Sequence, residues 1–225
     1  MIKRTIQFGD YDTAAHGLWT LTAWEFPEPE VEENLVHVPG RAAGPLDLST
    51  ALTDGKPMYG SRPLTVTLES SEGDRLARVA RISEMVNKLH GQRVKFVLPD
   101  HPLHYGVGRL KVETLYNDLA HASVQVTGTC EPWLYANDET VLPLQVTATA
   151  QTLRLRNAGG MTLVPLVEVA AAADETVNLV YGPHSWGLGP GTYKLPDLEL
   201  TPGDHVITYS GAGTLTITYR EAVIR

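Results

Sequence analysis

Side chains that could do catalytic or metal chemistry are scattered along this sequence rather than grouped. The chain has eight histidines and a single cysteine, Cys130. His101 and His104 are the closest histidine pair, but Pro102 between them indicates a turn and not a helix face that could present two metal ligands. No Gly-x-Ser-x-Gly elbow marks a nucleophile, and Cys130 lies in an apparent strand, where a thiol is typically buried and inert. Nothing marks a carboxylate pair for glycoside hydrolysis. We therefore expect a protein that is not an enzyme and that uses no metal or other cofactor.

One segment has the composition of a ligand-binding loop. It runs Tyr181-Gly-Pro-His-Ser-Trp-Gly-Leu-Gly-Pro-Gly-Thr-Tyr193. Aromatic rings flanked by glycines can stack on sugar rings, with Trp186 and Tyr193 as the rings and His184 as a hydrogen-bonding neighbour. The alternative is that Trp186 closes the end of a β-sandwich or touches a neighbouring protein. The segment thus predicts either a carbohydrate-binding face or a packed loop.

The most unusual local pattern has the chemistry of a rigid connection. It runs Val38-Pro-Gly-Arg-Ala-Ala-Gly-Pro-Leu-Asp-Leu48 and is followed by Tyr59-Gly-Ser-Arg62. Pro39 fixes φ and lacks a donor, Gly40 permits positive φ, and Arg41 places a guanidinium on the turn. We expect a shaped, stiff turn here and not a catalytic loop.

The elements that must position these residues are mostly strands. In the first half, alternating apolar residues and turn signals predict strands at 2–8, 18–26, 62–69, 93–98, 107–115 and 122–130. Short strands without helical periodicity follow at 144–156, 162–170, 176–181, 192–200, 204–209 and 213–219. The expected fold is mainly β. An N-terminal α+β sandwich with one helix spans residues 1–135, and an all-β sandwich of jelly-roll or galectin-like type spans 136–225.

The single predicted helix covers residues 74–90. Asp74 is its expected N-cap, and Gly91 stands where a left-handed C-terminal residue belongs. Its apolar stripe consists of Leu76, Val79, Ala80, Ile82, Ser83, Val86 and Leu89. A basic ridge on another face consists of Arg75, Arg78 and Arg81. This ridge either serves solubility or docks onto an acidic neighbour, such as the Glu25–Glu33 segment of a second subunit.

Charge and cysteine content exclude several functional classes. The formal net charge is −8 and no basic stripe is present, which disfavours nucleic-acid binding. One cysteine cannot form an intramolecular disulfide. The first residues lack the apolar core of a signal peptide, and no run reaches membrane-spanning length. These features predict a protein that folds in a reducing cytoplasm and does not enter a membrane.

Six pieces of the sequence, taken in order, resemble the distal tail protein family of long-tailed bacteriophages. They are Pro39-Gly-Arg41, Leu89-His-Gly91, Tyr105-Gly-Val-Gly-Arg109, Cys130-Glu-Pro-Trp133, Arg154–Gly159 with Val164-Pro165, and the closing hairpin formed by Gly203–Ile207 and Gly211–Glu221. The first motif departs from the family pattern, because two residues, Ala42 and Ala43, separate its arginine from the following glycine.

The resemblance implies a structural virion protein, the distal tail or baseplate hub subunit. Its N-terminal domains would close a homo-oligomeric ring, usually a hexamer, and its C-terminal β-domains would point outward. The ring would join the tail tube protein to the tail-tip hub proteins, with DNA only as passing cargo in the channel. Such a protein is made in the host cytoplasm and resides at the virion tail tip. The alternative function is a carbohydrate-binding module that recognises host-surface glycans.

Subunit contacts in such a ring are predicted at the rigid turn, at the Tyr59–Arg62 corner and at the start of a central strand. The residues are Pro39, Gly40, Arg41, Asp47, Tyr59, Arg62, Gly108 and Arg109. The three arginines would donate forked hydrogen bonds to carboxylates or carbonyls of the neighbouring subunit. Alternatively, they would brace turns within their own subunit.

Overall fold

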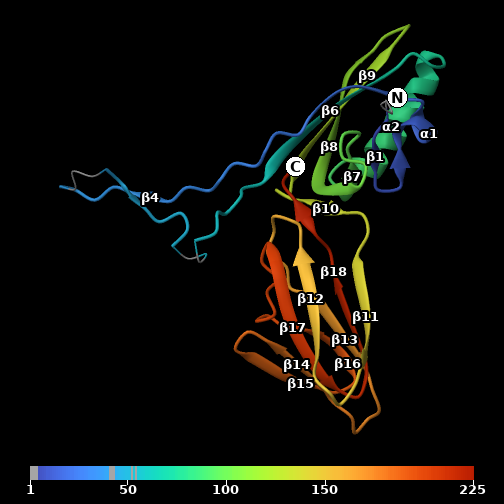
Figure 1. Ribbon diagram of the computed structural model, residues 1–225. Helices are drawn as coiled ribbons and strands as arrows, with labels where there is room; N and C mark the ends of the chain where they lie inside the picture. The colour runs from blue at the N-terminus through green and yellow to red at the C-terminus, as the bar shows by residue number, and fades with distance from the viewer. Residues whose placement is uncertain (1–4, 41–43, 52, 54) are drawn as a thin grey trace. The chain divides into compact units, whose positions relative to one another are not determined.

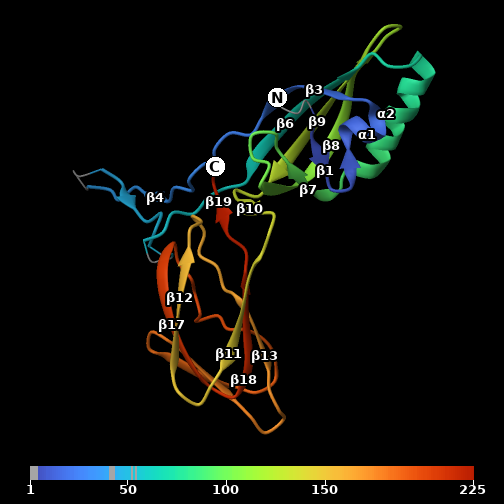
Figure 2. The same cartoon turned by 45° about the vertical axis from the view of Figure 1, so that its right-hand side comes forward.

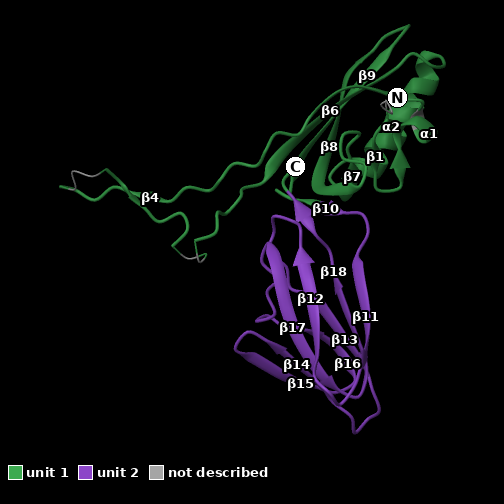
Figure 3. Ribbon diagram, viewed as in Figure 1, with its two compact units in different colours: residues 1–134, 224–225 green, residues 135–223 purple. Residues whose placement is uncertain are grey.

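A computed structural model describes residues 5–40, 44–51, 53 and 55–225 of the chain. Two units are present (Figure 3): unit 1 contains Met1–Leu134 with Ile224–Arg225, and unit 2 contains Tyr135–Val223. Strands dominate both units, so the mainly β class predicted from the sequence is confirmed. Two short strands, β10 (Leu134–Ala136) and β19 (Ala222–Val223), lie next to the boundary in the sequence.

Unit 1 is built on an antiparallel sheet with the strand order β2-β1-β7-β8-β9-β6-β3 (Figure 1). The strands are β1 (Gln7–Phe8), β2 (Tyr11–Asp12), β3 (Thr20–Glu25), β6 (Arg62–Ser70), β7 (Arg93–Val97), β8 (His104–Asn117) and β9 (Ala122–Cys130). Period-two alternation sends Leu64, Val66 and Leu68 of β6 into the core, as the sequence predicts. All three side chains are almost fully buried, in the same core as Met85 and Leu89 of the following helix.

The main helix, α2 (Arg75–Leu89), begins and ends as its sequence predicts. The Asp74 carboxylate accepts a hydrogen bond from the backbone N–H of Ala77 at 2.8 Å, and Gly91 has a φ of 76°. The prediction of a single helix is wrong, because a five-residue helix, α1 (Thr13–Gly17), follows Asp12 as its N-cap. Residues 9–17 are rich in turn-forming types, and so short a helix has no apolar periodicity that would distinguish it from a turn.

The rotation of α2 about its axis differs from the prediction. Leu76 is 77% exposed and Val79 is 43% exposed, although both belong to the predicted buried stripe. Arg78, which the sequence places on an exposed basic ridge, is only 1% exposed. The side that faces the sheet consists of Arg78, Met85 and Leu89, with Ile82 and Val86 partly buried. Arg78 accounts for this rotation, because its guanidinium donates to the carbonyls of Gly73 at 2.6 Å, Asp118 at 2.9 Å and Leu119 at 3.0 Å.

A long extended segment leaves the sheet between β3 and β6 (Figures 1 and 2). We call residues 27–61 the arm. Its regular structure is a small antiparallel pair formed by β4 (Leu35–Val36) and β5 (Leu46–Asp47). None of its described residues belongs to the apolar core of unit 1.

Unit 2 is a β-sandwich of two four-stranded antiparallel sheets, β11-β18-β13-β16 and β12-β17-β14-β15. The strands are β11 (Thr140–Val146), β12 (Gln151–Asn157), β13 (Leu166–Ala170), β14 (Val177–Tyr181), β15 (His184–Leu188), β16 (Gly191–Lys194), β17 (Gly203–Gly211) and β18 (Gly213–Tyr219). The predicted strand 144–156 is in fact two strands in different sheets, and β15 was not predicted. Inward side chains from both sheets form one core, including Val167, Leu179, Ile207 and Ile217.

Candidate assembly surface

The arm presents apolar side chains to solvent. Its exposed large apolar residues are Val31, Leu35, Val36, Val38, Leu46 and Met58. Isolated exposed apolar residues are common on protein surfaces, but six within one extended segment mark an interaction surface. A two-stranded hairpin is also only marginally stable by itself in water. The arm therefore exposes an apolar surface that the described residues of unit 1 do not bury.

Backbone hydrogen bonds join the two sides of the arm at several points, among them Glu32 N–H to the Met58 carbonyl at 2.8 Å and Gly60 N–H to the Glu30 carbonyl at 2.9 Å. Beyond the β4–β5 pair, Val31 forms an isolated antiparallel bridge with Tyr59. The Asp47 carboxylate accepts from the backbone N–H of Ser49 at 2.9 Å, and the Ser49 hydroxyl accepts from the N–H of Asn34 at 2.8 Å. Hydrogen bonds from Ser49 hold the pKa of the Asp47 carboxyl below its usual value. Asp47, a predicted contact residue, thus ties the two sides of the arm together.

The turn at the end of the arm has the backbone that its residues predict. Gly40 and Gly44 both have a φ of 80°, a conformation that side chains with a Cβ rarely adopt. Pro39 is exposed and directly precedes this turn. Arg41 lies outside the described residues, so its predicted contact stays a prediction.

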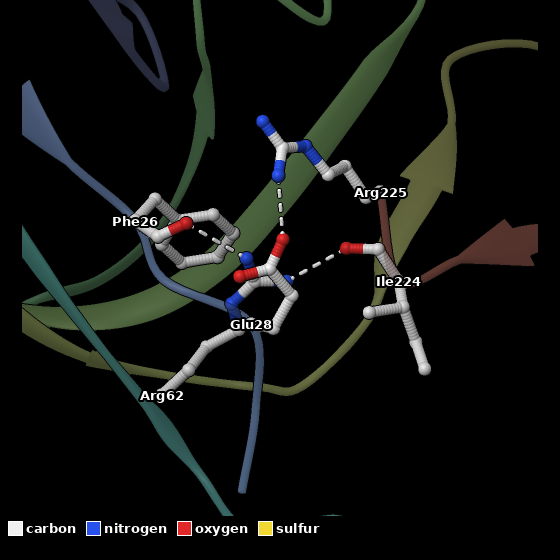
Figure 4. Close-up of polar contacts among 5 residues, drawn as sticks. All are labelled: Phe26, Glu28, Arg62, Ile224 and Arg225. Atoms are coloured by element: carbon white, nitrogen blue, oxygen red, sulfur yellow. Dashed lines mark hydrogen bonds and ion pairs between the residues drawn. The ribbon is translucent and has the colours of Figure 1, made fainter.

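Arg62 closes the base of the arm (Figure 4). Its side chain is buried, at 3% exposure, and its two terminal nitrogens donate to three backbone carbonyls. The acceptors are Phe26 at 2.9 Å, Ile224 at 2.8 Å and Pro132 at 3.2 Å. The guanidinium carbon also lies 3.6 Å from the centroid of the Phe26 ring, a cation–π contact. Burial lowers the pKa of this guanidinium, which remains charged at physiological pH.

The sequence left two roles open for Arg62, a contact with a neighbouring subunit or a brace within its own chain. This geometry corresponds to the brace. Phe26 is the last residue before the arm and Arg62 the first after it, so one side chain joins the two ends of the arm. The acceptors lie 36, 70 and 162 residues from Arg62 in sequence. Next to this group, Arg225 pairs with Glu28 at 2.6 Å. A backbone hydrogen bond and, after it, this pair with Arg225 lower the pKa of the Glu28 carboxyl. We call Phe26, Arg62 and their carbonyl partners the neck.

The other predicted contact residues of unit 1 lie on or beside the sheet. The Tyr59 ring meets the Trp133 ring edge to face, with centroids 5.4 Å apart. Gly108 is a packing glycine, because a Cβ there would lie 2.4 Å from the sulfur of Cys130. Arg109 is exposed on β8 and donates to the Gly91 carbonyl at 2.6 Å. Tyr59 lies near the neck, and Gly108 and Arg109 lie in the central strands.

Sequence reasoning did not identify the partners of Arg62. Phe26, Pro132 and Ile224 act through backbone carbonyls, which every residue type carries. The Phe26 ring and the two prolines after it, Pro27 and Pro29, are the available signal that an ordered strand ends and an extended segment begins.

In unit 2 the three predicted ligand-contact residues lie on the edge strands of two different sheets, β15 and β16. His184 and Trp186 on β15 stack with ring centroids 5.8 Å apart and an angle of 13° between the planes. Trp186 and Tyr193 are half-buried and pack against the unit 2 core, and the Tyr193 hydroxyl donates to the Gly189 carbonyl at 3.0 Å. His184 therefore occupies part of the Trp186 ring face. This arrangement favours the packed-loop interpretation over a sugar-stacking platform.

Residues with reactive chemistry remain separate in the structure. In the described part of the chain no group of three or more His, Cys, Asp or Glu side chains is placed to hold a metal ion. Burial raises the pKa of the Cys130 thiol to about 12, which keeps it protonated and unreactive. Neither α1 nor α2 has the length and apolarity to cross a bilayer, and no other helix occurs among the described residues.

Comparison with known proteins gives a structural match along the whole chain. The crystal structure of the Dit (gp 19.1) protein of SPP1 superposes with a TM-score of 0.68 and 15% sequence identity, covering 97% of this chain and 98% of that chain. That protein is described as a paradigm of the hub adsorption apparatus in phages that infect Gram-positive bacteria. No protein-family model and no curated protein sequence matches this chain. The chain thus has the fold of SPP1 Dit over both of its units.

Proposed function

We propose that this chain is a distal tail subunit of a long-tailed bacteriophage, a structural virion protein that joins the tail tube to the host-adsorption apparatus. The observation that carries this proposal is the fold shared with SPP1 Dit across 97% of the chain. The six ordered sequence motifs support it from an independent direction. The absence of a marked catalytic constellation in the sequence is consistent with a structural role.

In this proposal unit 1 is the ring-forming domain and the product is a homo-oligomer, a hexamer in the expected case. A closed ring requires one surface of a subunit to meet a different surface of the next at a fixed rotation. The arm, with its exposed apolar residues and its braced neck, supports a role as one of those surfaces. The tail tube protein would seat on one face of the ring and tail-tip hub proteins on the other. DNA would cross the channel only as cargo, and the net charge of −8 would limit adhesion.

The test is the oligomeric state of the purified chain, measured by light scattering and negative-stain imaging. We expect closed rings with an open channel at high protein concentration. A matched variant replaces residues 28–60 with a short Gly-Ser linker, which keeps Phe26 and Arg62 at the neck. This variant should remain monomeric while unit 2 unfolds at the same denaturant concentration as in the wild type. A wild-type chain that forms no oligomer at any concentration would argue against the ring.

A further inference from the structure

Four cationic side chains gather on the outer face of the unit 1 sheet, the face that does not contribute to the core shared with α2. Arg93 and Lys95 alternate with inward residues on β7, and Arg109 and Lys111 do the same on β8. Because β7 and β8 are adjacent and Arg93 stands opposite Arg109, all four side chains share one face. The sequence shows no basic run, because the four residues come from two strands that only pairing brings together. We call these four residues the cation face.

The two arginines of the cation face lie directly opposite each other, an arrangement that is unfavourable for like charges. Glu131 relieves part of this repulsion through an ion pair with Arg93. Arg109 keeps its charge, because it donates to the neutral carbonyl of Gly91 at 2.6 Å. The pairing of the two strands therefore holds positive charge together at a cost to the chain itself.

The two lysines also keep their charges. The Lys95 ammonium lies 4.3 Å from the centroid of the Tyr105 ring, which is a neutral partner. Lys111 is exposed and forms no ion pair in the part of the chain that the structure describes. Lys95, Arg109 and Lys111 thus leave three positive charges on this face, in a chain whose formal net charge is −8.

The neighbouring positions on the same face carry hydroxyl groups. Strand pairing places Thr127 and Thr129 of β9 beside Lys111 and Arg109, and Thr65 of β6 beside Thr127. These hydroxyls can donate hydrogen bonds to anionic oxygens. None of the large exposed apolar side chains of unit 1 lies at these positions.

Carboxylates mark the borders of the cation face. Glu113 follows Lys111 by two residues on β8, toward the β8–β9 turn at residues 118–121. Glu25 and Glu69 belong to β3 and β6, on the far side of β9. The positive charge is therefore confined to β7 and the adjoining half of β8.

This composition favours a nucleic acid over a protein as the partner. The centre of a protein–protein interface is usually apolar, rich in aromatic residues and depleted of charge. Phosphate groups, in contrast, are bound by Arg, Lys, Ser, Thr and Gln side chains. Lys95 stands opposite Val107, so the cations at this level and at Arg109 and Lys111 follow at steps of about 7 Å along the strands. A row of charges suits a polyanion rather than a single small anion.

We propose that the cation face binds the phosphate backbone of DNA, weakly and without reading its sequence. This inference deepens the proposed function and rests on it, since DNA is the cargo that crosses the proposed ring. Contacts to phosphate groups carry no sequence information, and binding of this kind lets DNA slide along the protein. The acidic remainder of the chain limits the strength of the contact.

The test is the salt dependence of DNA binding, measured by fluorescence anisotropy with a short labelled duplex at protein concentrations where light scattering shows single subunits. Each neutralised phosphate contributes about −0.9 to the slope of log K against log salt. Three cations predict a slope of about −2.7, an affinity loss of about fortyfold between about 50 and 200 mM salt. Lys111→Gln should change the slope to about −1.8 and the loss to about twelvefold. Lys111→Arg keeps the charge and should keep the wild-type slope.

Arg75→Gln is the matched control, because it removes one exposed positive charge from α2, which packs against the other face of the sheet. Both glutamine variants should unfold like the wild type, since neither side chain is buried. Arg75→Gln should bind DNA with the wild-type slope. An equal change of slope in both variants would show that net charge governs binding, and an unchanged slope in Lys111→Gln would remove that lysine from the contact; either result overturns the cation face.

Two further outcomes separate this inference from its alternatives. If poly-glutamate displaces the duplex as readily as unlabelled DNA at equal negative charge, the face belongs to an acidic protein segment and the DNA assignment is wrong. Closed rings from a chain that binds no DNA even at low salt would overturn the cation face and leave the ring standing. DNA binding that depends on Lys111, in a chain that forms no ring at any concentration, would overturn the ring alone.

Discussion

Replacing Arg62 with methionine tests whether this side chain braces the neck or reaches a neighbouring subunit. Methionine keeps much of the length and the apolar contact of arginine and removes every donor. Three partly buried carbonyls then lose a hydrogen bond, at about 1 kcal/mol each. Loss of the contact with the Phe26 ring adds about 1 kcal/mol. The guanidinium no longer has to be desolvated, which returns about 1 kcal/mol. We therefore expect the free energy of unfolding of unit 1 to fall by about 3 kcal/mol.

The assay is urea unfolding followed by tryptophan fluorescence. A Trp186→Phe background removes the tryptophan of unit 2, so that the signal comes from Trp19, Trp24 and Trp133 of unit 1. With a slope of about 2 kcal/mol per molar urea, the midpoint should move down by about 1.5 M. Arg109→Met is the control, because that side chain is exposed and should cost less than about 1 kcal/mol.

The result that would refute the bracing role is specific. If Arg62→Met unfolds at the wild-type midpoint and yet fails to assemble, the guanidinium acts between subunits. If Arg62→Met instead loses much of its free energy of unfolding but still assembles at low temperature, the guanidinium acts only within its own chain.

Three further predictions follow from contacts in the two units. Gly108→Ala should lower the stability of unit 1 by about 2 kcal/mol through overpacking against Cys130, and adding Cys130→Ala should restore about half in a double-mutant cycle; no coupling between the two would contradict the contact. Backbone hydrogen bonds from His121 and Ala120 lower the pKa of Asp118 below 3.8, so its stabilising effect is complete above that pH and is lost as pH falls through the folded-state pKa. An NMR titration should give a midpoint below 3.8, and a normal midpoint would show that the turn is not held by this carboxylate. Trp186→Ala should destabilise unit 2 by about 2 kcal/mol without changing a glycan-array profile. Loss of glycan binding at unchanged stability would restore the carbohydrate hypothesis.

The sequence was sufficient where local rules decide the structure. The bounds of α2 follow from Asp74 and Gly91, because capping depends on residues within one turn of the helix end. The inward residues of β6 follow from period-two alternation, because one face of the sheet is buried. Positive φ at Gly40 follows from the residue type and its neighbours.

The rest depends on contacts that are distant in sequence. The apolar stripe of α2 predicted the inward position of Ile82, Val86 and Leu89 but not the exposure of Leu76 and Val79. A buried arginine is improbable until the carbonyls of Asp118 and Leu119, 40 and 41 residues from Arg78, are known. Arg62 was predicted to donate to carboxylates or carbonyls, either of a neighbouring subunit or within its own. Its acceptors here are three carbonyls of its own chain, and no local pattern identifies them. The Pro-Gly segment predicted a stiff turn. That this turn lies on a long arm depends on the pairing of β3 with β6, which are distant in sequence.

The two buried arginines have the same structural task at opposite ends of the sheet. Arg62 binds three carbonyls at the base of the arm, and Arg78 binds three carbonyls where the β8–β9 turn meets α2. A planar guanidinium can join several backbone segments at once, which an aliphatic side chain cannot do. Each arginine therefore fixes backbone segments of its own chain, and in the proposed assembly this order would lower the entropy cost of docking. Beyond the neck, backbone hydrogen bonds such as Leu48 N–H to the Asn34 carbonyl at 2.8 Å keep the two sides of the arm together.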